Sequence, residues 1–315
     1  MSMRPMSTSV STPLAPADRH SATPIVDRGS GPPVVLIPGI HGRWEYFSRT
    51  VDALSQVARV ITFSLRDTLT LQPDVPLQDA RSLQDAAPLP DTTSLEHTTQ
   101  GNGDRLADLD TYVDQVERAL TERAVSRAIV CGISFGGLIA LRFAARQPGR
   151  VTALVLVSTP GPGFRPSPAH ERYMQRPGLF APLFFAGAPR RLLDEIRAAL
   201  PGRADRWRFH WQQLQTLVRA PLSPSAMAVR ARLIASARPV ADCRTITAPT
   251  LVVCGEPSLD HIVPVESSRQ YAELIVGARL VTLERTGHLG CVTRPQAFAA
   301  AVHEFVSELE LWDAA

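Results

Sequence analysis

The sequence contains no lysine, so all 33 of its basic residues are arginine. This absence excludes a Schiff-base lysine, a pyridoxal-phosphate anchor and the lysine of a Walker A loop. A basic stripe with interleaved aromatic residues is also absent, and the formal net charge is only +3. A surface of mixed charge is therefore favoured over a nucleic-acid interface.

Cysteine is scarce, and its spacing excludes the common redox and zinc motifs. The four cysteines show no Cys-x-x-Cys pair, and both Cys131 and Cys254 lie inside apolar runs. A free thiol in such a run behaves as a small buried hydrophobic group. We expect no structural disulfide and a reducing, cytoplasmic location.

Long hydrophobic runs are missing as well. Residues 1–24 are rich in Ser, Thr and Pro and contain no apolar stretch of signal-peptide length. This composition predicts a disordered tail over residues 1–22. The longest apolar candidate, Leu179–Ala188, is too short to cross a bilayer, so no membrane span is expected.

Short, unbroken runs of Val, Ile and Leu recur along the chain and are typical of parallel strands buried on both faces. Their alternation with amphipathic segments predicts an α/β fold, with a mostly parallel sheet covered by helices on both faces. The predicted strands are 23–27, 34–37, 59–64, 127–132, 151–158, 250–254 and 279–284. The predicted helices are 45–57, 106–123, 138–147, 265–275 and 295–309.

Two segments interrupt this alternation. Residues 66–104 are polar and rich in proline, which predicts a long loop within the core; disorder or loose packing is favoured over a lid. Residues 161–240 carry eight of the nineteen aromatic residues and predict a helical cap. The predicted helical stretches of this cap are 189–200, 203–219 and 224–236, and the two parts of the core around it are 23–160 and 241–315.

One serine has the surroundings of a nucleophile. Ser134 lies in the segment Gly132-Ile133-Ser134-Phe135-Gly136-Gly137, between a predicted strand and a predicted helix. A sharp turn there would hold the serine in a strained conformation, and the glycines would let strand and helix approach closely. The hydroxyl would then project at the start of a helix, where the dipole favours developing negative charge.

A serine needs a base to remove its proton, and His288 is the best placed of eight histidines. His288 follows the predicted strand 279–284 and precedes the last helix, so it belongs to the same edge of the sheet as Ser134. His303 falls within the final helix and His210 within the insertion, where structural roles are favoured. The other histidines are His20, His41, His97, His170 and His261.

The base needs an acid to fix its tautomer and stabilise its charged form. Asp260 and Glu256 both follow the predicted strand 250–254, and we favour Asp260 over Glu256. No carboxylate follows the preceding strand, where the sequence is Ser158-Thr159-Pro160-Gly161.

The oxyanion of an acyl-transfer reaction needs backbone donors. The N–H after the nucleophile belongs to Phe135, and a second donor is expected from the loop after the first long strand. We predict Ile40 as that donor, with Gly39 permitting the turn.

These motifs resemble the α/β-hydrolase fold superfamily, in its cap-bearing, esterase-like branch. The resemblance covers residues 23–310, and the chain order of nucleophile, acid and histidine is the order of that family. It implies the α/β-hydrolase fold with a helical cap insertion. Serine at position 134 argues against epoxide hydrolases and haloalkane dehalogenases, which carry aspartate there. The departures are Pro38 before Gly39, a longer segment before Asp260, and the long connection 66–104.

The sequence thus predicts a serine hydrolase that cleaves a carboxylic ester, thioester or lactone, with Ser134, Asp260 and His288 as catalytic residues and Ile40 and Phe135 as the oxyanion hole. No cofactor or metal is expected. The partner would be a small molecule with an apolar acyl or aryl group, although the cap aromatics could equally pack the cap onto the core. An acyltransferase or carbon–carbon bond hydrolase with the same residues is the alternative, and a non-catalytic binding protein is disfavoured.

Overall fold

Seven strands form one sheet in the computed structural model, which describes residues 24–67 and 108–309. The strand order is β1-β3-β2-β4-β5-β6-β7; β1 is antiparallel to β3, and every other neighbouring pair is parallel. The strands are β1 (Val26–Arg28), β2 (Pro33–Ile37), β3 (Arg59–Thr62), β4 (Ala128–Ile133), β5 (Val151–Val157), β6 (Thr250–Cys254) and β7 (Arg279–Thr282). The predicted mostly parallel sheet is confirmed.

Alternate residues of the central strands serve two separate cores. In β2, Val35 and Ile37 face a cluster that includes α2 (Leu109–Glu122) and α3 (Phe135–Arg146). Val34 and Leu36 face the opposite cluster, formed with α1 (Ser48–Leu54) and α12 (Pro295–Glu308). Because successive side chains of a strand point to opposite faces, a run of apolar residues is needed where both faces are covered.

The covering helices match the prediction in place and differ at their ends. The predicted helix 45–57 begins as a 3₁₀ turn, η1 (Trp44–Phe47), and continues as α1 (Ser48–Leu54). The helix predicted to begin at residue 138 begins at Phe135, directly after Ser134. The remaining core elements are η2 (Pro148–Arg150), α10 (Val265–Leu274), α11 (Gly290–Thr293) and α12 (Pro295–Glu308).

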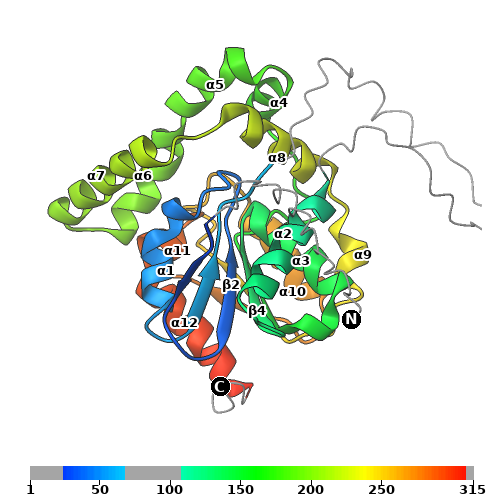
Figure 1. Cartoon of the computed structure of the whole chain (residues 1–315). Helices are drawn as coiled ribbons and strands as arrows, with labels where there is room; N and C mark the ends of the chain where they lie inside the picture. Colours follow the sequence, from blue (N-terminus) through cyan, green and yellow to red (C-terminus); the bar gives the residue numbers. More distant parts are fainter. Residues whose placement is uncertain (1–23, 68–107, 310–315) are drawn as a thin grey trace, which may run out of the picture.

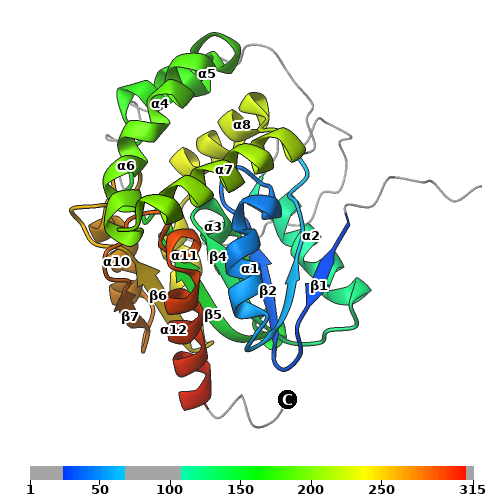
Figure 2. The same cartoon turned by 90° about the vertical axis from the view of Figure 1, so that its left-hand side faces the viewer.

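Between β5 and β6, where the backbone of every residue is described, the chain forms six helices. These are α4 (Pro168–Gln175), α5 (Pro177–Ala186), α6 (Ala188–Ala199), α7 (Arg203–Arg219), α8 (Pro224–Ser236) and α9 (Pro239–Cys243). Figures 1 and 2 show α4 to α8 as a helical cap standing over one end of the sheet. The predicted stretches correspond to α6, α7 and α8, and the domain limits 161 and 240 stay a prediction.

Helices α4, α5 and α9 were absent from the prediction, and proline explains the difference. Each of these helices begins with a proline, as do α8 and α12. Proline is well tolerated in the first helical turn, because its missing N–H would have no partner there. Prolines that look like interruptions in the sequence therefore mark the starts of short helices.

Two further predictions concern the whole chain. All four cysteines are buried and free. In the described parts of the chain, no helix is both long and apolar enough to cross a membrane. The predicted tail over residues 1–22, and the predicted loop 66–104 apart from Arg66 and Asp67, lie outside the described residues.

Candidate active site

Ser134 occupies the sharp turn that the sequence predicts between β4 and α3. Its backbone has φ 53° and ψ −117°, a region that residues with a side chain rarely adopt. A Cβ atom on Gly132 would collide with the backbone of Gly136, and one on Gly136 would collide with the backbone of Ile37. The strained serine conformation therefore depends on two flanking positions without side chains.

His288 and Asp260 meet Ser134 at the carboxyl edge of the sheet. The Nε2 atom of His288 lies 3.1 Å from Ser134 Oγ, and its Nδ1 atom lies 3.3 Å from Asp260 Oδ2. The three residues follow β4, β7 and β6, and all three are buried. The structure thus brings together the nucleophile, base and acid predicted from the sequence.

The structure also separates the two candidate acids. The Oδ1 atom of Asp260 accepts hydrogen bonds from the N–H groups of Ile262 and Val263, at 3.0 and 2.9 Å, which leaves Oδ2 for His288. Glu256 instead accepts the N–H of Arg285 at 2.6 Å. Asp260 is therefore the one of the two whose carboxylate reaches the histidine.

The electrostatic environment favours a charged pair of His288 and Asp260. Burial lowers the pKa of His288, but the charge and hydrogen bond of Asp260 and the charge of Glu195 outweigh it, so the pKa lies above the ordinary 6.5. Burial raises the pKa of Asp260, but His288 and the two backbone donors lower it below the ordinary 3.8. Asp260 is therefore an anion near neutral pH and stabilises the protonated imidazole.

His41 is a second imidazole in the same cavity as Ser134. Burial, followed by the positive charges of His288 and Arg230, lowers its pKa to about 4. Its ring packs against Tyr46 at 5.0 Å. His41 is therefore neutral near neutral pH and can donate or accept a hydrogen bond in the cavity without adding charge.

None of the other described histidines is hydrogen-bonded to Ser134. His170 lines the cavity on the cap side, with its Nδ1 atom 2.6 Å from Ser167 Oγ. His303 lies on α12 and His210 is exposed on α7. His261 is half exposed, 3.9 Å from Asp194. His20 and His97 fall outside the described residues.

The two predicted oxyanion donors lie on the expected segments. Gly39 and Ile40 line the cavity with Ser134, and a Cβ atom on Gly39 would lie 3.4 Å from Ser134 Cβ. Phe135 is the first residue of α3, and its side chain is buried against Tyr112. The role of the two N–H groups stays a prediction.

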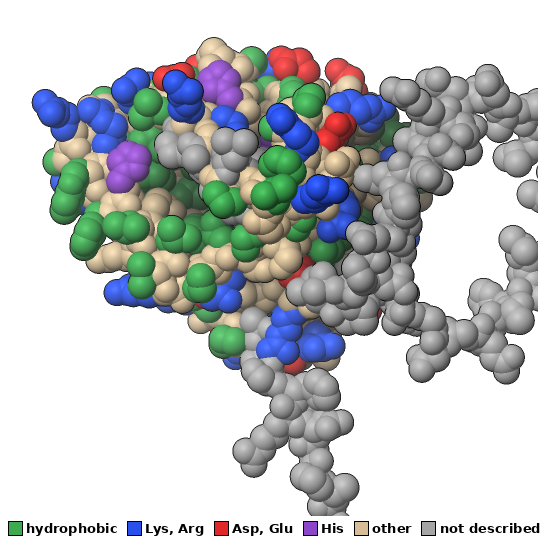
Figure 3. Space-filling view, turned by 90° about the horizontal axis from the view of Figure 1, so that it is seen from above, with side chains coloured by type: hydrophobic (Ala, Val, Ile, Leu, Met, Phe, Trp, Pro, Cys, Tyr) green, Lys and Arg blue, Asp and Glu red, His purple; other side chains and the backbone are tan. Residues whose placement is uncertain are grey.

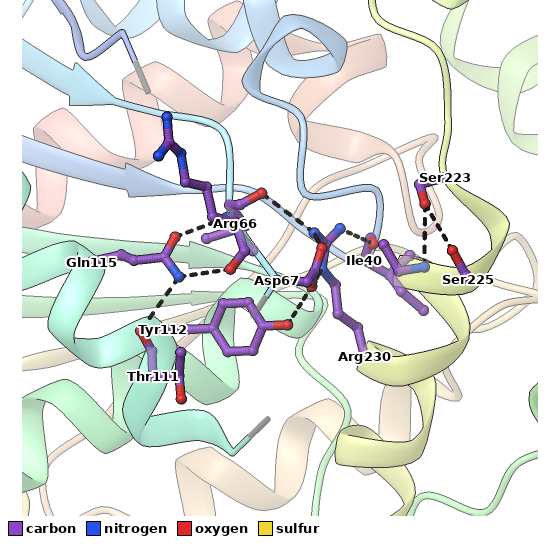
Figure 4. Close-up of polar contacts among 11 residues, drawn as sticks. Ile40, Arg66, Asp67, Thr111, Tyr112, Gln115, Ser223, Ser225 and Arg230 are labelled. Carbon is purple, nitrogen blue, oxygen red and sulfur yellow. Dashed lines mark hydrogen bonds and ion pairs between the residues drawn. The ribbon is translucent and has the colours of Figure 1, made fainter. Parts of the chain in front are cut away.

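A buried arginine from the cap holds the loop that carries Ile40. Arg230 of α8 donates to the carbonyl oxygen of Ile40 at 2.9 Å and forms an ion pair with Asp67, at 2.9 and 2.5 Å (Figure 4). Tyr112 donates to the same carboxylate at 2.5 Å. The side chains of Arg230 and Asp67 are only 3% and 8% exposed, so the cap is tied to the core by a neutralised, buried pair.

A buried glutamate from the cap holds the loop that carries His288. Glu195 of α6 is fully buried and accepts the N–H of Leu289 at 3.0 Å. The N–H of Gly287 also contributes a hydrogen bond, and Thr293 Oγ1 lies 3.5 Å from the carboxylate. The backbone on both sides of His288 is thus bound to one cap side chain.

Sequence reasoning missed both Glu195 and Arg230. Each lies on a correctly predicted cap helix, and neither belongs to a local motif that marks a site. The sequence offers only a weak indication of Glu195. Residues 161–240 contain thirteen arginines and only four acidic residues, of which Glu195 is one.

The cavity above Ser134 has a volume of about 240 Å³ and lies between the core and the cap. Its polar lining comes mainly from Ser134, His288, His41, His170 and Arg191. Most of the remaining wall is apolar and includes Ile40, Phe47, Met174, Leu222, Met227 and Ile234. Among the described residues, no group of three or more His, Cys, Asp or Glu side chains could hold a metal ion.

Comparisons with known proteins agree with this fold. A sequence model of the alpha/beta hydrolase fold family matches residues 32–295. A 2-hydroxymuconate semialdehyde hydrolase of Pseudomonas sp. is 30% identical over 67% of this chain and 74% of its own length. A pimeloyl-[acyl-carrier protein] methyl ester esterase of Neisseria meningitidis is 29% identical over 65% of this chain and 80% of its own. The enol-lactonase of Burkholderia xenovorans has a similar fold, with a TM-score of 0.65, 20% identity, and coverage of 90% of this chain and 95% of that one.

Proposed function

Because this chain belongs to the alpha/beta hydrolase fold family, we propose that it is a serine hydrolase that cleaves a carboxylic ester, thioester or lactone through an acyl-enzyme on Ser134. The observation that carries the proposal is the chain of contacts from Ser134 through His288 to Asp260 at the floor of an apolar cavity. A serine beside a histidine that is itself paired to a carboxylate is the arrangement needed for acyl transfer.

In the first half of the reaction, Ser134 Oγ attacks the carbonyl carbon while His288 Nε2 takes the hydroxyl proton. The tetrahedral intermediate collapses when the bond to the leaving oxygen or sulfur breaks, and His288 gives that atom the proton. In the second half, His288 takes a proton from water, and the hydroxide attacks the acyl-enzyme. Ser134 leaves with the proton returned, and the acid product is released.

The groups around Ser134 and His288 each support a different part of the proposed reaction. Asp260 stabilises the imidazolium that forms twice in each cycle. In this proposal the N–H groups of Ile40 and Phe135 bind the oxyanion, and one such donor contributes about 3–4 kcal/mol to the transition state. Glu195 acts as a positioning residue because it binds the backbone on both sides of His288.

The cavity supports a substrate with an apolar acyl or aryl group. Its lining is mostly apolar, while the polar side chains gather around Ser134 and on the cap side. Among the relatives, the pimeloyl-[acyl-carrier protein] methyl ester esterase supports the ester bond of the proposal.

Fluorophosphonate labelling with peptide mapping tests the nucleophile, and a graded panel of esters tests the substrate class. We expect label on Ser134 and a fall in kcat of about a millionfold for Ser134→Ala. An unlabelled Ser134 in folded protein would overturn the proposal in favour of a binding protein. Labelling without ester hydrolysis would instead favour an acyltransferase or a carbon–carbon bond hydrolase.

The two candidate acids provide a matched pair of variants. Asp260→Asn should lower kcat by about ten-thousandfold, because His288 loses the anion that stabilises its charged form. Glu256→Gln should leave kcat within a few-fold, because Glu256 binds the N–H of Arg285 and not His288. Equal losses in the two variants would contradict the assignment of Asp260.

A further inference from the structure

The charge of the molecule is divided unevenly between cap and core. Residues 161–240 contain 13 arginines and four acidic residues, a net charge of +9. The rest of the chain has 20 arginines and 26 acidic residues, a net charge of −6. The small total of +3 therefore hides a strongly cationic cap.

One helix of this cap exposes a stripe of large apolar side chains. Trp207, Trp211, Leu214 and Val218 of α7 follow the helical spacing i, i+4, i+7 and i+11, so they lie on one face. They are 65%, 50%, 50% and 77% exposed, while Phe209 is buried against the core. We call these four residues the α7 stripe.

The α7 stripe has the composition of a helix that lies in a membrane interface. The rings of Trp207 and Trp211 stack in parallel, 5.8 Å apart. Exposed arginines at 203, 208 and 219 come from the same helix. Figure 3, which looks down on the cap, shows hydrophobic side chains along the edge where α7 lies, with arginines around them. Tryptophan beside arginine on an amphipathic helix is typical of interfacial binding.

Three occupants could cover this stripe, and the charge selects among them. A second copy would bring two cationic caps together, which repulsion opposes. An acidic protein would satisfy the arginines, but it would not by itself account for two exposed tryptophans, a leucine and a valine along one helix face. An anionic lipid surface offers headgroups for the arginines and acyl chains for the apolar side chains.

We propose that the cap docks on an anionic lipid surface, with the α7 stripe inserted among the acyl chains and the arginines of α7 on the headgroups. The active-site cavity lies beneath the same cap, with walls from α4, α6 and α8. The docked enzyme would therefore hold its cavity close to a surface that is itself rich in apolar acyl groups.

Co-sedimentation of the full chain with vesicles tests the proposal and does not depend on catalysis. We expect binding to phosphatidylcholine vesicles that contain about one-third phosphatidylglycerol, loss of binding in high salt, and little binding to phosphatidylcholine alone. The variant Arg203→Ser/Arg208→Ser/Arg219→Ser should bind about a hundredfold more weakly, at about fivefold for each arginine. Trp207→Ser/Trp211→Ser should lose at least about tenfold.

Matched controls lie on the core. Val276 is 96% exposed outside the cap, so Val276→Ser should bind as the parent does, and Arg118→Ser on α2 serves the same purpose for charge. The α7 variants should keep their circular dichroism and their turnover of a water-soluble ester, since none of the substituted residues lines the cavity.

Three results would overturn the proposal. The first is no binding of the parent chain to vesicles of either composition. The second is a dimer whose mass falls to that of a monomer in Trp207→Ser/Trp211→Ser, which would make the stripe a contact between copies. The third is tight, salt-sensitive binding of soluble polyglutamate with no binding to vesicles, which would favour an acidic protein.

Discussion

The cap is fastened to the core by two buried charges of opposite sign, and their surroundings differ. Arg230 of α8 is neutralised by Asp67, which also receives the hydroxyl of Tyr112. Glu195 of α6 is held by backbone N–H groups and Thr293, and within residues 24–67 and 108–309 it belongs to no ion pair. The positive charge of Arg230 is neutralised by its ion pair with Asp67, whereas the negative charge of Glu195 acts on nearby titratable groups such as His288.

Because their surroundings differ, we expect Arg230 to affect mainly the stability of the protein and Glu195 to affect mainly its reactivity. A neutralised pair contributes mainly through the cost of breaking it, because removal of one partner leaves the other charge buried. An uncancelled charge shifts the equilibria of nearby titrating groups. Glu195 raises the pKa of His288 together with Asp260, and after burial it is the next cause that raises the pKa of Cys291. The Arg230 contact should therefore govern folding, and the Glu195 contact should govern catalysis.

The largest expected effect is on stability at Arg230. The variant Arg230→Met should lower the free energy of unfolding by about 3–5 kcal/mol, because Asp67 would remain buried without its partner. Urea denaturation measures this loss. Arg232→Met, at an exposed position on the same helix, is the control and should change it by less than about 0.5 kcal/mol. Equal midpoints for the two variants would show that Arg230 is not a structural anchor.

A smaller loss of stability is expected at Glu195. The variant Glu195→Ala leaves the part-buried N–H of Leu289 without its acceptor, at a cost of about 1–3 kcal/mol. The loop of His288 would also lose its contact with the cap, so kcat should fall more than stability alone explains. Asp194→Asn is the control, since Asp194 is largely exposed beside it. If Glu195→Ala unfolds at a lower urea concentration but keeps the kcat of the parent, the role of Glu195 is structural only.

The pH profile of kcat/KM tests the charge of Glu195 separately from its shape, because Glu195→Gln changes the charge of the side chain and keeps its shape. In the proposed reaction His288 must be neutral to accept the proton of Ser134, so its raised pKa should place the acid limb of kcat/KM above pH 6.5 in the parent chain. Glu195→Gln removes one anion that raises this pKa, so the limb should move to lower pH. The titratable groups that face His288 are Asp260, Glu195 and His41. His41 is neutral in this pH range, and Asp260 is retained in the variant. A limb that does not move would mean that the charge of Glu195 does not reach His288.

The smallest effect concerns the pH dependence of folding. Burial, the largest cause, raises the pKa of Glu195 above its ordinary 4.5, so the folded state binds this proton more tightly than the unfolded state. The stabilisation is present at pH values below 4.5 and is lost as the pH rises through the folded-state pKa. The stability of the parent relative to Glu195→Gln should therefore decline as the pH rises from 4.5 through the folded-state pKa of Glu195. Urea titrations across that range measure the trend, and a constant difference would contradict it.

The sequence predicted the parts of the site that local pattern encodes. Ser134 is marked by glycines that the turn requires, and His288 and Asp260 follow strands whose ends meet at one sheet edge because the strands are parallel. Glu195 and Arg230 could not be predicted, because their partners lie 94 and 163 residues away in the chain. Such contacts depend on how the cap packs on the core, and no short motif records that packing.

The four buried thiols make this chain convenient for chemical labelling. Each is at most 1% exposed, and burial raises the pKa of every one of them, so the reactive thiolate is suppressed in the folded protein. A cysteine introduced on the exposed face of α7 would then be the main site of reaction with a maleimide. A fluorescent probe placed there could report its depth in a bilayer, while the native thiols would become reactive only when the protein unfolds.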